Sequence, residues 1–159
     1  NGFIPFGRDS SVHCYDYMLH YIGYPISGEL HNPGYITSHR HGAEIGDYPD
    51  SFSTAFVASY FSNDLSTLER SYTTTKNFDE IPADRTDVVV IAVFQYTNSD
   101  VGCDYHFAVL LSDGEWADKP GAREARCGDL TYNGSYWNDG DKIIDDGKDT
   151  IFFIVRRST

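Results

Sequence analysis

The sequence predicts an α+β domain, because helical patterns lie in its first half and strand-like patterns in its second half. Residues 11–23 and 50–60 carry apolar side chains at helical spacing. Residues 87–97, 104–121 and 150–156 contain short apolar runs, bounded by turn residues. We therefore expect an N-terminal helix packed on a mainly antiparallel β-sheet.

Length, composition and charge limit the possible classes of protein. The chain has 159 residues, of which 40% are hydrophobic, so residues 1–159 form one domain with a sizeable core. No apolar run reaches the roughly eighteen residues of a membrane helix, which predicts no membrane insertion. With 24 acidic and 12 basic residues the net charge is −12, which disfavours a nucleic-acid partner. Because the chain starts at Asn1, we expect a larger parent polypeptide.

The first predicted helix, residues 11–23, places Cys14 in its first turn. Ser10 or Ser11 suits the N-cap, and Gly23 suits the C-terminal stop. Its apolar face has residues three or four positions apart, namely Tyr15, Met18, Leu19 and Ile22. Free backbone N–H groups and the positive end of the helix dipole favour a thiolate in a first turn. Cys14 is therefore a candidate nucleophile, and a small buried cysteine is the alternative.

The segment from residue 24 to residue 50 is rich in proline and glycine and predicts a loop. Within it, His39 and His41 could bind a metal together with Asp47 or Asp50. No third ligand stands at a recognisable spacing, so we favour a solvated or structural loop.

The second predicted helix begins at Asp50 or Ser51 and is extended by a turn over residues 64–70. The face that we expect it to bury consists of Phe52, Ala55, Phe56, Ser59 and Tyr60.

Residues 87–97 predict a central strand, and residues 150–156 predict a closing strand. Residues 122–133 are read as a polar loop, and residues 138–149 as turns around a short apolar pair. The second of these segments contains four possible calcium ligands, Asp139, Asp141, Asp145 and Asp146. Because Ile143 stands where a calcium loop needs another oxygen ligand, we favour a solvated turn.

Residues 104–121 predict a β-hairpin whose turn is Asp113–Gly114, since this dipeptide suits the positive φ angles of a tight turn. A turn centred there places Val109 opposite Trp116 or Ala117.

The same register brings His106 close to Asp118, at one end of the hairpin. A carboxylate beside a histidine fixes the imidazole tautomer and stabilises its protonated form, as a general base requires. With Cys14 as nucleophile, these residues form a candidate Cys14–His106–Asp118 triad.

The three cysteines of the chain allow one disulfide and one free thiol. Cys103 precedes the predicted hairpin and Cys127 follows it, so we expect a disulfide between them at its base. Cys14 would then remain free.

The triad pattern resembles the papain-like cysteine hydrolases, a class that includes bacterial cell-wall amidases, peptidases, secreted effectors and toxins. The hairpin is similar to a group of poorly characterised, mainly bacterial domains. The matching residues are His106–Phe107, Asp113–Gly114, Trp116 and Lys119–Pro120–Gly121. Two positions differ, because His13 stands where asparagine is usual and Asp118 replaces a second histidine.

The resemblance implies a papain-like fold and a cysteine-dependent reaction on an amide bond, without a cofactor. Cys14 would attack a carbonyl carbon, His106 would move the proton, and Asp118 would orient His106. Peptide hydrolysis, amidase activity and glutamine deamidation or transamidation all use this chemistry. A protein or peptide substrate and a secreted or translocated toxin or effector are implied.

Two other classes of function are compatible with the sequence. In the first, the chain is a secreted binding module for protein or carbohydrate, in which Cys14 is structural and aromatic residues such as Trp116 and Trp137 line a groove. In the second, His39 and His41 serve a metal-dependent hydrolase.

Overall fold

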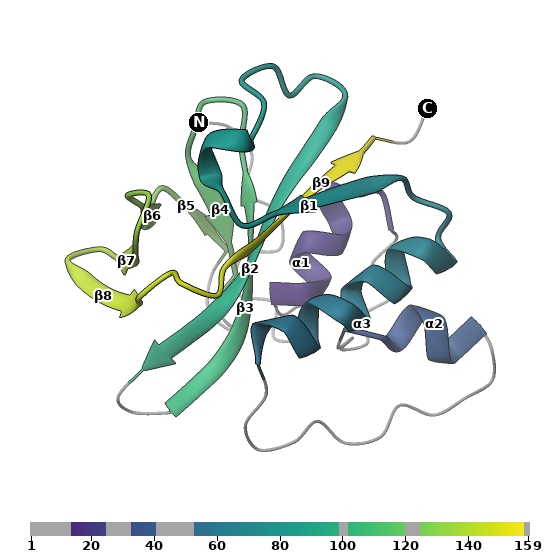
Figure 1. Ribbon diagram of the computed structural model, residues 1–159, viewed down its shortest axis with the longest axis horizontal. Helices are drawn as coiled ribbons and strands as arrows, with labels where there is room; N and C mark the ends of the chain where they lie inside the picture. Colours follow the sequence, from purple (N-terminus) through teal and green to yellow (C-terminus); the bar gives the residue numbers. More distant parts are fainter. Residues whose placement is uncertain (1–13, 25–32, 41–52, 99–101, 120–124, 158–159) are drawn as a thin grey trace.

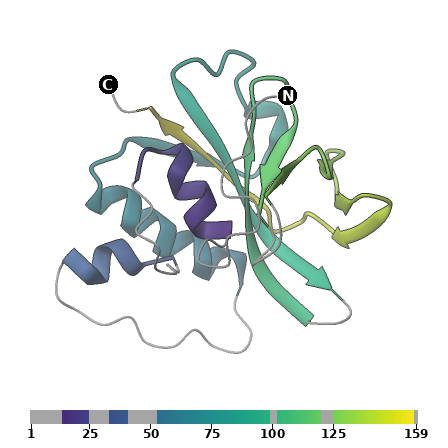
Figure 2. The same cartoon turned by 180° about the vertical axis from the view of Figure 1, so that it is seen from behind.

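The protein folds as an α+β domain in three layers (Figures 1 and 2). Within the part of the chain that the structure describes, three helices cover one face of a six-stranded sheet, and a small three-stranded sheet covers the other. The predicted fold class and the mainly antiparallel sheet are confirmed. The computed structural model describes residues 14–24, 33–40, 53–98, 102–119 and 125–157.

The predicted N-terminal helix is confirmed over its described part, α1 (Cys14–Tyr21). The chain leaves the helix through Gly23 at φ +83°, the residue predicted to stop it. The predicted N-caps, Ser10 and Ser11, lie outside the described residues. Helix α2, Tyr35–Arg40, occupies a segment that was predicted to be a loop.

Helix α3, Thr54–Thr67, confirms a second long helix, but the face predicted to be buried is wrong. Ser53 is the N-cap, and its hydroxyl accepts a hydrogen bond from the backbone N–H of Phe56. The buried side includes Val57, Ala58, Phe61 and Leu65, whereas Ala55 and Ser59 are exposed. No helix among the described residues is long and apolar enough to cross a membrane.

A buried carboxylate joins the three helices. Asp64 of α3 accepts hydrogen bonds from the hydroxyl of Tyr15 in α1, the backbone N–H of Gly34 and both the N–H and the hydroxyl of Thr37 in α2. Each carboxylate oxygen therefore has two donors. This satisfies a side chain that is 0% exposed.

The large sheet is antiparallel throughout, in the order β1-β9-β2-β3-β4-β5. Its central strand is β2, which confirms the prediction for residues 87–97, and β9 confirms the closing strand. A short 3₁₀ helix, η1, covers Phe78–Glu80. The strands of this sheet are β1 (Tyr72–Thr75), β2 (Val88–Asn98), β3 (Gly102–Leu110), β4 (Trp116–Asp118), β5 (Arg126–Cys127) and β9 (Ile151–Arg156).

The β3–β4 hairpin has the predicted register. Gly114 adopts φ +90°, and the turn is closed by a 2.8 Å hydrogen bond from the N–H of Leu111 to the carbonyl of Glu115. Val109 lies opposite Ala117, one of its two predicted partners. The turn dipeptide therefore sets which residues meet across the hairpin.

The small sheet comes from segments that were predicted to be loops and turns. It consists of β6 (Leu130–Tyr132), β7 (Trp137–Asp139) and β8 (Lys142–Asp145). Trp137 stacks on Phe94 of β2, with ring centroids 4.1 Å apart and an interplanar angle of 5°. Trp137 and Trp116 are both buried, so neither can line a groove on the surface.

The predicted Cys103–Cys127 disulfide is wrong. Cys127 is a free thiol on β5, opposite Ala117, which in turn lies opposite Val109. Cys103 lies six positions before Val109 on β3, which is about 20 Å along a strand. A disulfide requires Cα atoms within about 7 Å.

Candidate functional site

His106 lies between Asp118 and Cys14, so the structure brings the three predicted residues together. Its Nε2 is 2.8 Å from Oδ2 of Asp118, and the Cys14 side chain lies close enough to help raise the pKa of the imidazole. Because Nε2 is occupied by Asp118, Nδ1 is the nitrogen left for the thiol. His106 is 3% exposed and Cys14 is 7% exposed, so water is largely excluded from this contact.

Strand pairing explains how Asp118 reaches His106. Asp118 is the last residue of β4 and lies opposite Ala108 on β3. His106 precedes Ala108 by two positions, so both side chains lie on the same face of the sheet. Helix α1 packs against β3 and β4, and the Cys14 side chain at the start of its described part contributes to the pKa of His106.

Two aromatic rings from β2 hold the imidazole. Phe94 and Tyr96 contact His106 edge-on, with ring centroids 5.6 and 5.3 Å from that of the imidazole. Edge-on contacts of this kind are favourable between rings, and they restrict rotation of the histidine side chain. The orientation of His106 is therefore fixed from its sides as well as by Asp118.

The environment of His106 favours its protonated form. Burial acts to lower its pKa, but the hydrogen bonds to Asp118 and Cys14 and the charges of both side chains outweigh burial and raise the pKa of His106 to about 9. A histidine is therefore held as imidazolium at neutral pH, and a positive charge at this position favours a thiolate on a neighbouring cysteine.

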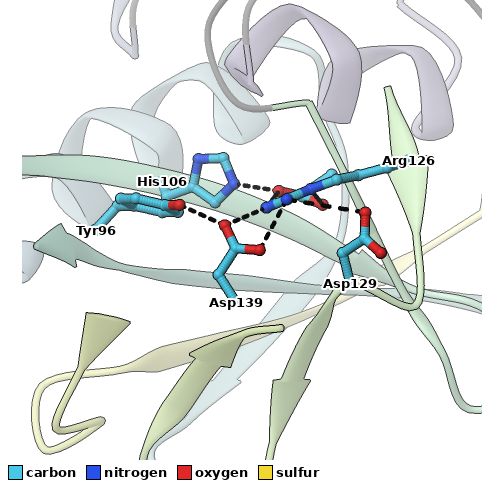
Figure 3. A network of polar contacts seen from close by, with 6 residues as sticks. Tyr96, His106, Arg126, Asp129 and Asp139 are labelled. Atoms are coloured by element: carbon cyan, nitrogen blue, oxygen red, sulfur yellow. Dashed lines mark hydrogen bonds and ion pairs between the residues drawn. The ribbon is translucent and has the colours of Figure 1, made fainter. Parts of the chain in front are cut away.

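Arg126 is a functional candidate that sequence reasoning missed. It lies on β5 directly opposite Asp118, and its Nε and Nη2 contact the two oxygens of Asp118 at 2.9 and 3.0 Å. Its Nη1 and Nη2 contact the two oxygens of Asp139 at 2.9 and 3.0 Å (Figure 3). The only weak signal in the sequence was an arginine inside a predicted polar loop, because the register of β5 depends on pairing with β4.

Asp139 and Tyr96 close the network on the small-sheet side. The Tyr96 hydroxyl donates to Asp139, while the ring of the same tyrosine packs on His106 (Figure 3). Burial acts to raise the pKa of Asp139, but its hydrogen bonds to Arg126 and Tyr96 lower it overall. Burial acts to lower the pKa of Arg126, and its contacts with Asp118 and Asp139 raise it overall. Both groups therefore remain charged at neutral pH.

The metal alternatives gain no support from the described part of the chain. Those residues contain no group of three His, Cys, Asp or Glu side chains that could hold a metal ion. His39 lies on α2 instead of in an extended segment, while His41, Asp47 and Asp50 lie outside the described residues. Asp139, a possible calcium ligand, is already paired with Arg126.

The arrangement is chemically suited to nucleophilic catalysis. An imidazole placed between a thiol and a carboxylate can take the thiol proton and later pass it to a leaving group. Cys14 is the first residue of the described part of α1. A comparison of the chain with protein-family models, curated protein sequences and solved structures found no match.

Proposed function

We propose that this protein is a papain-like, cysteine-dependent hydrolase or acyltransferase that acts on an amide bond. The observation that supports the proposal is the buried imidazole of His106, which contacts the Cys14 side chain and Asp118 at once. Reactive cysteines lie in such places, next to a protonated histidine and at the start of a helix. The resemblance to papain-like enzymes adds a protein or peptide substrate and a secreted or translocated effector or toxin role.

In the proposed reaction, the Cys14 thiolate attacks the carbonyl carbon of the amide and forms a tetrahedral intermediate. Protonated His106 gives its proton to the leaving nitrogen, the C–N bond breaks, and a thioester to Cys14 remains. His106 then takes a proton from the water that attacks the thioester, the C–S bond breaks to return the Cys14 thiolate, and the carboxylic acid product leaves. With ammonia as the leaving group the reaction is a deamidation, and with an amine in place of water it is a transamidation.

Asp118 and the start of α1 have supporting roles in this proposal. Asp118 holds the tautomer and orientation of His106 and stabilises the imidazolium, because it contacts Nε2 and leaves Nδ1 for the thiol. The backbone N–H of Cys14 supplies one donor to the developing oxyanion.

The alternative of an aromatic binding surface has less support. Trp116 and Trp137 are buried, and the large apolar side chains exposed by the described residues are only Tyr136 and Ile143. Two side chains make a small patch, below the size that usually marks an interaction surface.

The proposal is tested by alkylation of Cys14 with iodoacetamide as a function of pH. The Cys14 and Cys127 peptides are quantified by mass spectrometry in the same sample. Cys127 is a matched control, because burial first and then the charge of Glu115 raise the pKa of its thiol. At about pH 6.5 we expect Cys14 to react at least about tenfold faster than Cys127.

The His106→Ala variant should remove the advantage of Cys14 and leave the rate at Cys127 unchanged. Equal rates at the two cysteines in the native protein, unaffected by His106→Ala, would contradict the proposal. An activated Cys14 would justify a search for substrates among peptides and glutamine side chains.

A further inference from the structure

We infer that Arg126 is a positioning residue of the Cys14–His106–Asp118 site, which acts on His106 by clamping Asp118 and linking it to Asp139. This inference rests on the proposed function for its catalytic meaning. The contacts that carry it are independent of that function.

The guanidinium of Arg126 uses two of its edges. One edge, Nε and Nη2, contacts both oxygens of Asp118, and the other, Nη1 and Nη2, contacts both oxygens of Asp139. Because a guanidinium is planar and rigid, the two carboxylates are held in a fixed relation. The Asp118 carboxylate therefore cannot rotate without breaking a contact with Arg126, and Oδ2 stays directed at His106.

The clamp also controls how much negative charge His106 experiences. Asp118 is 0% exposed, so water cannot screen it, and the charge of Arg126 partly balances it. Asp139 in turn partly balances Arg126. Among the described residues, the titratable and charged groups around His106, its carboxylate and Arg126 include Cys14, Tyr17, Tyr96, Asp118, Arg126, Asp139 and Asp129, whose Oδ2 lies 3.8 Å from Nη1 of Arg126 (Figure 3).

This arrangement predicts that substitutions of Arg126 and of Asp139 shift the His106 titration in opposite directions. Arg126→Met removes a positive charge and leaves Asp118 to His106 alone, so the imidazolium becomes more stable and the His106 titration moves up by about one pH unit. Asp139→Asn removes a negative charge and frees more of the Arg126 charge for Asp118, so the titration moves down. Arg126→Lys keeps the charge but loses the fork, which predicts a smaller shift and slower Cys14 alkylation.

The experiment measures the titration of the His106 imidazole by NMR in the intact chain, with the resonance assigned from His106→Asn. Cys14 alkylation is measured on the same samples. Arg85→Lys is the matched control, because Arg85 holds the β3–β4 turn through the carbonyls of Leu111 and Ser112 and its hydrogen bonds do not reach Asp118. It should leave the His106 titration unchanged.

The result that supports the inference is an upward shift in Arg126→Met and a downward shift in Asp139→Asn. If Arg126 only supported the fold, these two substitutions would not shift the His106 titration in opposite directions. If Arg126→Met does not fold, Arg126→Lys and Asp139→Asn still test the clamp. A His106 titration equal to that of the wild type in both variants would overturn the inference. If the titrations shift but wild-type Cys14 alkylates no faster than Cys127, the clamp stands and the proposed function fails.

Discussion

Asp118 and Asp64 are both fully buried aspartates, and each forms the centre of a polar network. Both side chains are 0% exposed, and both oxygens of each carboxylate accept hydrogen bonds. The donors differ, because Asp64 is held by hydroxyl groups and backbone N–H groups, whereas Asp118 is held by an arginine and a histidine. Burial alone therefore does not distinguish the two carboxylates, but the chemistry of their donors does.

The location of the two networks supports this distinction. Asp64 joins Tyr15 of α1 and Thr37 of α2 to α3, and its donors are neutral groups. Asp118 lies where β3, β4 and β5 meet, and Arg126 extends its network to the small sheet. We interpret the Asp64 network as one that holds the helices together. We interpret the Asp118 network as the part of the site that sets the orientation and protonation of His106.

Asparagine at each position should produce the largest effect and separate the two networks. In Asp64→Asn, the new NH₂ group replaces an oxygen that accepts from the backbone N–H of either Gly34 or Thr37. A backbone donor cannot reverse its role, so we expect a loss of about 3 kcal/mol in the free energy of unfolding, measured with urea. The pH profile of Cys14 alkylation in the folded variant should match that of the wild type.

Asp118→Asn is the matched variant, and it should change the alkylation profile as well as stability. Without the carboxylate charge the imidazolium is less stable, so Cys14 alkylation near neutral pH should slow by about tenfold. If Asp64→Asn slowed alkylation as much as Asp118→Asn does, the distinction between the two networks would be lost.

The sequence predicted the Asp118 network only as far as local pairing reaches. His106 and Asp118 are separated by one tight turn, and Asp113–Gly114 determines the register that joins them. Arg126 and Asp139 come from later strands, whose pairing depends on tertiary contacts that no short pattern encodes. The disulfide prediction failed for the same reason, because it extended the hairpin register without β5.

The Asp64 network was not predicted, because the face of α3 that was expected to be buried is the wrong one. The large aromatic residues Phe56 and Tyr60 suggested one face, but the helix buries the face that carries Phe61 and Asp64. A charged residue on a helix is normally expected to be exposed, and only the position of Asp64 between α1 and α2 provides the four donors that allow its burial. Helix α2 itself was hidden in a segment with proline and glycine.

The next largest difference between the two networks should appear in how the free energy of unfolding depends on pH. The pKa of His106 is about 9 in the folded protein, above roughly 6.5 in an unfolded chain. Between these values the folded state binds more protons, so the stabilisation is complete below about pH 6.5 and is lost as the pH rises through 9. We expect urea unfolding to show a loss on the order of 2 kcal/mol over this range.

His106→Asn should flatten this dependence, whereas Asp64→Asn should lower stability equally at every pH in the range. If the free energy of unfolding of His106→Asn fell with pH as much as that of the wild type, the pH dependence would come from other groups. The two networks would then not differ in this respect.

The smallest effects should come from the two tyrosines that donate to the networks. Tyr15→Phe removes one of the four donors to Asp64, inside a fully buried cluster, and we expect a loss of about 1 to 2 kcal/mol in the free energy of unfolding without a change in the His106 titration. Tyr96→Phe removes the donor to Asp139, which keeps both contacts with Arg126, so we expect a loss below about 1 kcal/mol. Because Asp139 then carries a less balanced charge, the His106 titration measured by NMR should rise by a few tenths of a pH unit. A shift of His106 in Tyr15→Phe as large as that in Tyr96→Phe would mean that the two networks are coupled through α1, and that Asp64 acts on the site as well as on the helices.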